Sequence, residues 1–141
     1  MDPAFWAKVH GATTHFPIAM TFVACLCDTA ALCFWQKPAA GGLRAAGRYA
    51  AIIAALGSIP AVISGLVMTR GDMLGHGELR WHHLFVWPAF ALLVVAAVWR
   101  SLVRDQISRR GYVGYVGAIC LLTALIAATG YWGGELLQTF P

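Results

Sequence analysis

The sequence predicts an all-α integral membrane protein, a bundle of four transmembrane helices. Hydrophobic residues make up 60% of the 141-residue chain and charged residues only 11%, and the mean hydropathy is +0.69. An average globular domain is about 45–50% apolar and about 25% charged, and a bundle of this size has too little interior to bury the excess. The composition therefore excludes a soluble enzyme, a disordered chain and a nucleic-acid-binding domain.

The apolar residues fall into four runs, each close to the roughly 20 residues that a helix needs to cross a bilayer. The first covers residues 16–35 and is interrupted only by Asp28, and the second covers residues 49–68 without a charge. The third, residues 81–99, opens with two histidines, and the fourth, residues 112–132, again has no charge. The runs do not alternate as lipid-facing β-strands do. We therefore expect the whole chain to form one domain of four spans.

Basic residues set the expected orientation, because Lys and Arg accumulate in cytoplasmic loops. The connectors after the first and third spans hold seven with their flanks: Lys37, Arg44, Arg48, Arg100, Arg104, Arg109 and Arg110. The opposite side holds only Lys8, Arg70 and Arg80. The sequence thus predicts that both termini and the connector of residues 69–80 face outward, into the periplasm for a bacterial inner-membrane protein.

All five histidines fall on that outer side. His10 and His15 precede or open the first span, His76 lies in the outer connector, and His82 and His83 open the third span. Imidazole is the commonest metal ligand, and helix bundles build metal and haem sites from side chains on facing helices. An interfacial histidine can also simply solvate a helix end. Because these side chains come from two helices, we interpret them as a candidate cofactor site.

The first cofactor hypothesis is haem b with two axial histidines. His15 is the expected ligand from the first span, and His83 or His82 is the expected ligand from the third. His83 is slightly favoured because its helical face continues into bulkier apolar residues. His10 and His76 would form a second pair or support the first.

Four charged residues near the histidines fit this hypothesis. Arg70, Arg80 and Lys8 would pair with the haem propionates. Glu135 would hold the second nitrogen of a ligating imidazole. The alternative hypothesis is a copper or zinc ion held by two or three of the histidines, with Glu135 nearby. His10 and His15 point about 140° apart on a helix, so both reach one ion only if the helix unwinds between them.

Asp28 is the other unusual residue, because an ionisable group inside a span is costly and is a functional candidate by default. It lies about 20 Å along the helix from His15, so it belongs to a different site. We expect a structural polar contact with Thr21, Thr123 or Tyr115. The functional alternative is a proton path or a contact with a quinone headgroup.

The run HGATTHFPIA at residues 10–19 resembles the opening of bacterial membrane proteins of domain-of-unknown-function family 2231, which start with two histidines five apart followed by Phe-Pro-Ile. Further matches are Asp28, Ser-Gly-Leu at residues 64–66, a histidine opening the third span, and YWGGEL at residues 131–136. One departure is Gly11, where the family often has proline. The resemblance covers nearly the whole chain, and the fusion of some relatives to Rieske-type iron–sulfur domains implies redox work.

Together these features predict a small b-type cytochrome that transfers electrons near the outer membrane face. It would act as a subunit of a redox chain in a homo- or hetero-oligomer, and not as a stand-alone enzyme. Its expected partners are the lipid bilayer, redox proteins or a quinone, without nucleic acid. The rival hypothesis is a copper- or zinc-binding protein, or a structural subunit that anchors partner proteins in the membrane.

Overall fold

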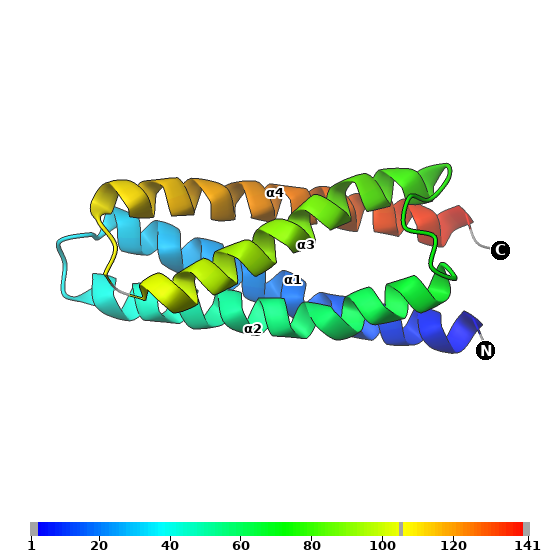
Figure 1. The fold of residues 1–141 in the computed structure, drawn as a ribbon, viewed down its shortest axis with the longest axis horizontal. Coiled ribbons are helices and arrows are strands. Elements are labelled where there is room, and N and C mark those ends of the chain that lie inside the picture. The colour runs from blue at the N-terminus through cyan, green and yellow to red at the C-terminus, as the bar shows by residue number, and fades with distance from the viewer. Residues whose placement is uncertain (1–2, 105, 140–141) are drawn as a thin grey trace.

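The computed structural model describes residues 3–104 and 106–139, and it folds them into four helices that run along one long axis (Figure 1). The helices are α1 (Pro3–Cys33), α2 (Ala39–Met68), α3 (Glu78–Val103) and α4 (Arg109–Thr139). No strand occurs among these described residues. All four helices are long and apolar enough to cross a membrane, which confirms the expected all-α, four-span architecture.

The helices extend beyond the apolar runs that predicted them. α1 begins at Pro3, well before Phe16, and ends two residues before Trp35; the other three expected spans lie inside their helices. A helix of 31 residues, such as α1, is about 46 Å long, whereas the hydrocarbon core of a bilayer is about 30 Å thick. The apolar run marks the part in lipid, and the helix continues into the interface because no residue there breaks it.

The bundle consists of two helix hairpins, because α1 packs mainly against α2 and α3 mainly against α4. The first turn of α1, the last turn of α4 and the α2–α3 connector lie at one end of the bundle (Figure 1). We call this the histidine end, since it holds His10, His15, His76, His82 and His83. The other two connectors lie at the opposite end, which we call the arginine end after Arg44, Arg48, Arg104, Arg109 and Arg110.

The densest packing lies in the middle of the bundle and toward the arginine end. The core contains many alanines, which allow the helices to approach closely, and large side chains from α4 such as Tyr112 and Ile119. By contrast, no residue between 4 and 16 of α1 or between 123 and 136 of α4 is buried. In Figure 1 the two hairpins accordingly lie apart at the histidine end.

Substitution of Gly47 in α2 provides a test of the close packing near the arginine end. A Cβ at this position would fall within 2.7 Å of the carboxyl atoms of Asp28, whereas a Cβ at Gly41 on the same helix would meet nothing within 4 Å. We expect Gly47→Ala to lower the free energy of unfolding by about 1–3 kcal/mol through overpacking. Gly41→Ala should be neutral or slightly stabilising, because alanine favours a helix. Thermal unfolding in detergent, followed by circular dichroism, measures both; an unchanged Tm for Gly47→Ala would contradict this packing.

Candidate functional site

His10 of α1 and His82 of α3 are held in the same way, each by the other helix of its hairpin. His10 Nδ1 lies 2.9 Å from the Ala61 carbonyl oxygen of α2 and 3.1 Å from the Ser64 hydroxyl. His82 Nδ1 lies 3.0 Å from the Thr129 carbonyl oxygen of α4. Because a carbonyl only accepts hydrogen bonds, Nδ1 is the donor in both rings, and Nε2 keeps a lone pair that is available to a ligand.

A glycine stands four residues after each accepting carbonyl, Gly65 after Ala61 and Gly133 after Thr129. A Cβ at Gly65 would come within 3.0 Å of the first imidazole, and a Cβ at Gly133 within 3.4 Å of the second. A helical side chain covers the turn that precedes it, so a larger residue here would cover the carbonyl that the histidine reaches. Each hairpin thus contains the same unit of histidine, carbonyl and glycine, which we call a histidine–glycine unit.

The two histidine–glycine units lie at the same end of the bundle, on different hairpins. His10 and His82 are both partly buried. They sit where α1 and α4 contribute no buried residue. The arrangement therefore offers two oriented imidazoles, one from each hairpin, at the least densely packed part of the structure. Such a pair can ligate a metal-containing group that lies between the hairpins.

His15 occupies a different face of α1. Five residues after His10 it is turned about 140° around the helix, and it is exposed. His15 therefore does not share the face of α1 that carries His10, and the axial pair of His15 and His83 stays a prediction. The sequence predicted that the histidines gather at one end of the bundle, but it did not reveal that His10 is the one that contacts the neighbouring helix.

His83 is the most buried of the five histidines. Only 8% of it is exposed, and its ring lies beside that of Trp87 with centroids 5.9 Å apart. Its Nδ1 atom has no hydrogen-bond partner among the described residues. It faces surroundings distinct from those of its neighbour His82, as expected for consecutive residues on a helix.

Three further predicted site residues lie at the histidine end: His76, Arg70 and Arg80. The side chain of His76 in the α2–α3 connector is 95% exposed and lies 3.4 Å from Asp72. The backbone N–H of Gly75 is the main cause that lowers the pKa of Asp72. Arg70 and Arg80 are exposed. In the described part of the chain, no three His, Cys, Asp or Glu side chains are grouped to hold a metal ion.

Glu135 of α4 was expected to hold the second nitrogen of a ligating imidazole. It is half-buried near the end of that helix. In the described contacts, backbone carbonyls accept the hydrogen bonds from His10 and His82 instead. The orienting groups were missed because any residue can supply a carbonyl; the available signal was the glycine four residues later.

Asp28 belongs to a second polar cluster, toward the arginine end. It is fully buried, and its carboxyl oxygens accept hydrogen bonds from the hydroxyls of Tyr112 at 2.5 Å and Tyr115 at 3.0 Å. Tyr115 was an expected partner, whereas the hydroxyls of Thr21 and Thr123 donate to carbonyls of their own helices. Asp28 thus ties α1 to α4. Tyr112 was not predicted as a partner. The available signal was its spacing from Tyr115, because residues three apart lie on one face of a helix.

Arg100 of α3 completes this cluster. It is fully buried, and its guanidinium Nη2 lies 3.7 Å from Asp28 Oδ1 and donates to the Arg44 carbonyl of α2 at 2.8 Å. Nη1 donates to the Arg104 carbonyl at 2.8 Å. Arg100 was counted among the charges of the arginine-end connectors, but it is an interior residue. Its contacts join α3 to both α1 and α2.

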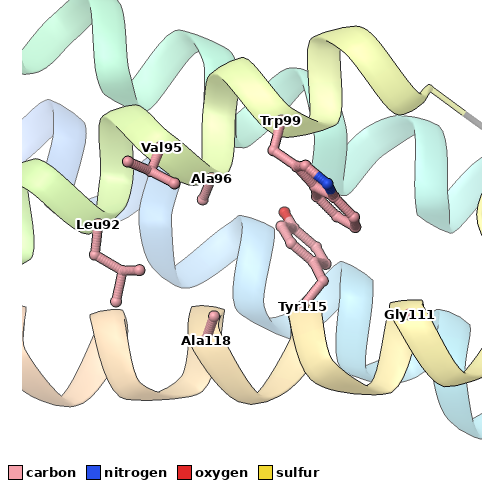
Figure 2. Close-up of a pocket in the computed structure, with 7 residues that line it drawn as sticks. All are labelled: Leu92, Val95, Ala96, Trp99, Gly111, Tyr115 and Ala118. Atoms are coloured by element: carbon pink, nitrogen blue, oxygen red, sulfur yellow. The ribbon is translucent and has the colours of Figure 1, made fainter.

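A shallow pocket of about 260 Å³ lies between α3 and α4 beside this cluster. Figure 2 shows its lining, in which the rings of Trp99 and Tyr115 face one another; their centroids are 5.3 Å apart and the rings are stacked. The other lining residues are small or aliphatic: Leu92, Val95, Ala96, Gly111 and Ala118. Tyr115 links this pocket to the buried carboxyl group of Asp28, and the pocket lining is mostly apolar.

A family model described as "Predicted membrane protein (DUF2231)" matches residues 7–140. The matched range includes both histidine–glycine units and the Asp28 cluster. No curated protein and no solved structure matches the chain.

The Asp28 cluster yields a prediction about stability. Asp28→Ala leaves Arg100 and two tyrosine hydroxyls without their buried partner, so we expect it to lower the free energy of unfolding by about 3–5 kcal/mol. Tyr115→Phe removes one hydrogen bond and should cost about 1.5–3 kcal/mol. Ser101→Ala is the control, because this exposed hydroxyl bonds only its own helix. Unfolding in detergent mixtures measures all three; a loss for Asp28→Ala as small as that for the control would refute a stabilising role.

Proposed function

The chain belongs to the DUF2231 family of predicted membrane proteins, and from this premise we propose that it is a small b-type cytochrome. In this proposal the protein binds haem b between its two hairpins, through His10 and His82, and transfers electrons within a membrane redox chain. The observation that carries the proposal is the pair of histidine–glycine units, one in each hairpin, at the same end of the bundle.

The number of ligands favours haem over a copper or zinc ion. The porphyrin supplies four nitrogens to iron, so the protein needs to add only axial ligands. Zinc and copper sites instead draw three or four ligands from side chains, and the described residues contain no such group of three. A ligating histidine also typically donates its other N–H to an acceptor that fixes the ring. His10 and His82 each have such an acceptor.

The packing at the histidine end supports a large, flat ligand. Gly11, Gly130 and Gly134 each lack a neighbour within 4 Å of the place where a Cβ would lie. These glycines flank the histidine–glycine units in α1 and α4, which have no buried residue here. Arg70 and Arg80 are exposed at the same end and would pair with propionates at the aqueous edge. Bound haem would supply a one-electron carrier whose potential depends on its axial ligands and surroundings.

We further propose that the histidine end faces outward from a bacterial inner membrane. Without the buried Arg100, six basic residues remain near the arginine-end connectors against Lys8, Arg70 and Arg80 at the histidine end. This excess still favours a cytoplasmic arginine end. Electron transfer would then take place near the periplasmic face.

Absorption spectra of the purified protein test haem binding. We expect a Soret band and sharp bands on reduction in the wild type, and loss of at least about nine-tenths of the haem in His10→Ala and in His82→Ala. His15→Ala is the matched control, because this histidine is exposed on the same helix, and it should keep its haem. Full haem content in His10→Ala would show that the assignment is wrong. A colourless wild-type protein that contains copper or zinc would favour the alternative.

Cysteine labelling tests the orientation. In a variant whose four native cysteines are replaced by alanine, His76→Cys places a thiol at an exposed position of the histidine end, and Ser108→Cys places one at the arginine end. A membrane-impermeant maleimide should label His76→Cys in intact spheroplasts, and Ser108→Cys only after lysis. The reverse pattern would overturn the orientation.

A further inference from the structure

A groove at the histidine end lies outside the two histidine–glycine units. It has a volume of about 620 Å³ and runs between the α2–α3 connector and the first turns of α3. Small-molecule sites typically have volumes of about 300–1,000 Å³. Its lining includes Met73, Leu74, Arg80, His83, Leu84 and Trp87.

One residue that lines the groove, His83, has a buried ring nitrogen without a hydrogen-bond partner in the described part of the chain, although the Met73 carbonyl group of the connector lies near its ring. His83 is 8% exposed, and its Nδ1 has no hydrogen-bond partner among the described residues. A buried polar atom without a partner is costly and rare in folded proteins. An imidazole nitrogen donates or accepts according to its tautomer. A ligand in the groove that carries a donor or an acceptor would therefore satisfy His83.

The wall beside His83 is aromatic and fixed in place. The Trp87 indole N–H donates to the Met73 carbonyl at 2.8 Å, which ties α3 to the connector. The rings of His83 and Trp87 lie with centroids 5.9 Å apart. Two further lining residues, Leu74 and Leu84, are 81% and 56% exposed. The groove thus combines a flat aromatic surface with an apolar rim that suits entry from the bilayer.

These features select the chemistry of the ligand. Arg80 is the only lining residue with a fixed positive charge, and it is exposed, so the groove is a poor site for burying a phosphate. An uncharged ring that carries oxygen atoms and an apolar tail fits better. A quinone carbonyl accepts a hydrogen bond and a quinol hydroxyl donates one, so each tautomer of His83 matches one redox form.

We propose that this groove binds the headgroup of a lipid-soluble quinone, with His83 as its hydrogen-bond partner and Trp87 as its ring contact. The groove adjoins the candidate haem ligand, since the rings of His82 and His83 lie with centroids 5.9 Å apart. The role of the quinone as the electron-exchange partner of the haem rests on the proposed function. Binding itself is separable from haem and is tested separately.

Retention of decylubiquinone by the purified protein in phosphatidylcholine nanodiscs tests the proposal, measured by chromatography after rapid separation of the free probe. We expect saturable binding that weakens at least about tenfold in His83→Phe, which keeps a ring and removes both nitrogens, and in Trp87→Leu. His15→Phe is the matched control and should bind as the wild type does. His83→Gln, which retains a donor and an acceptor, should recover part of the affinity and guards against a folding defect in His83→Phe.

Haem content, read from the same samples, separates this proposal from the proposed function. Saturable, His83-dependent binding to a haem-free wild-type protein would support the groove and reject the cytochrome. A haem-loaded protein without saturable quinone binding would overturn the groove alone. Equal affinities of wild type and His83→Phe for the quinone would also overturn it. So would displacement of the quinone by phosphatidylglycerol, if that displacement is lost when Arg80 is replaced by alanine.

Discussion

Inside a bilayer no water is available to pair with a polar side chain, so each polar group within the four helices needs a partner from the protein. Asp28 shows how fully this constraint shapes the bundle. Its carboxyl group takes two tyrosine hydroxyls from α4 and approaches the Arg100 guanidinium of α3. Arg100 in turn donates to carbonyls at the start of α2 and the end of α3. One buried carboxyl group on α1 is thereby linked, directly or through Arg100, to all three other helices.

The same constraint has a different solution at the histidine end. His10 and His82 each satisfy one ring nitrogen with a backbone carbonyl that a glycine leaves uncovered. Only half of the hydrogen-bonding capacity of each ring is used in this way, because an imidazole has two nitrogens. His83 differs from both, because its Nδ1 is buried and has no hydrogen-bond partner among the described residues. The imidazoles of this end therefore keep a nitrogen open to a ligand, whereas the Asp28 carboxyl group has its partners within the protein.

The two ends of the bundle consequently differ in what they contribute. Near the arginine end, small side chains and the Asp28 cluster bring the hairpins close together, and Gly47 packs directly against the carboxyl group. Near the histidine end, each hairpin is held mainly by its own contacts, and α1 and α4 bury no residue. The bundle thus combines a closely packed end with an end at which the imidazoles of His10 and His82 are oriented by backbone carbonyls and each keep a second nitrogen free of these contacts.

The sequence by itself determined the number of spans, the ends at which the charges and histidines gather, and the presence of an intramembrane carboxyl group at Asp28. These features depend on composition along the chain, because a helix converts position in sequence directly into depth in the membrane. Only the tertiary structure decided which residues face inward: His10 in place of His15, Tyr112 beside Tyr115, and Arg100 in the interior in place of a connector. In water, an apolar stripe on a helix reveals its buried face, but lipid is as apolar as a protein core. The rotation of each helix is therefore set by small residues and polar contacts on its neighbours, which no single apolar run records.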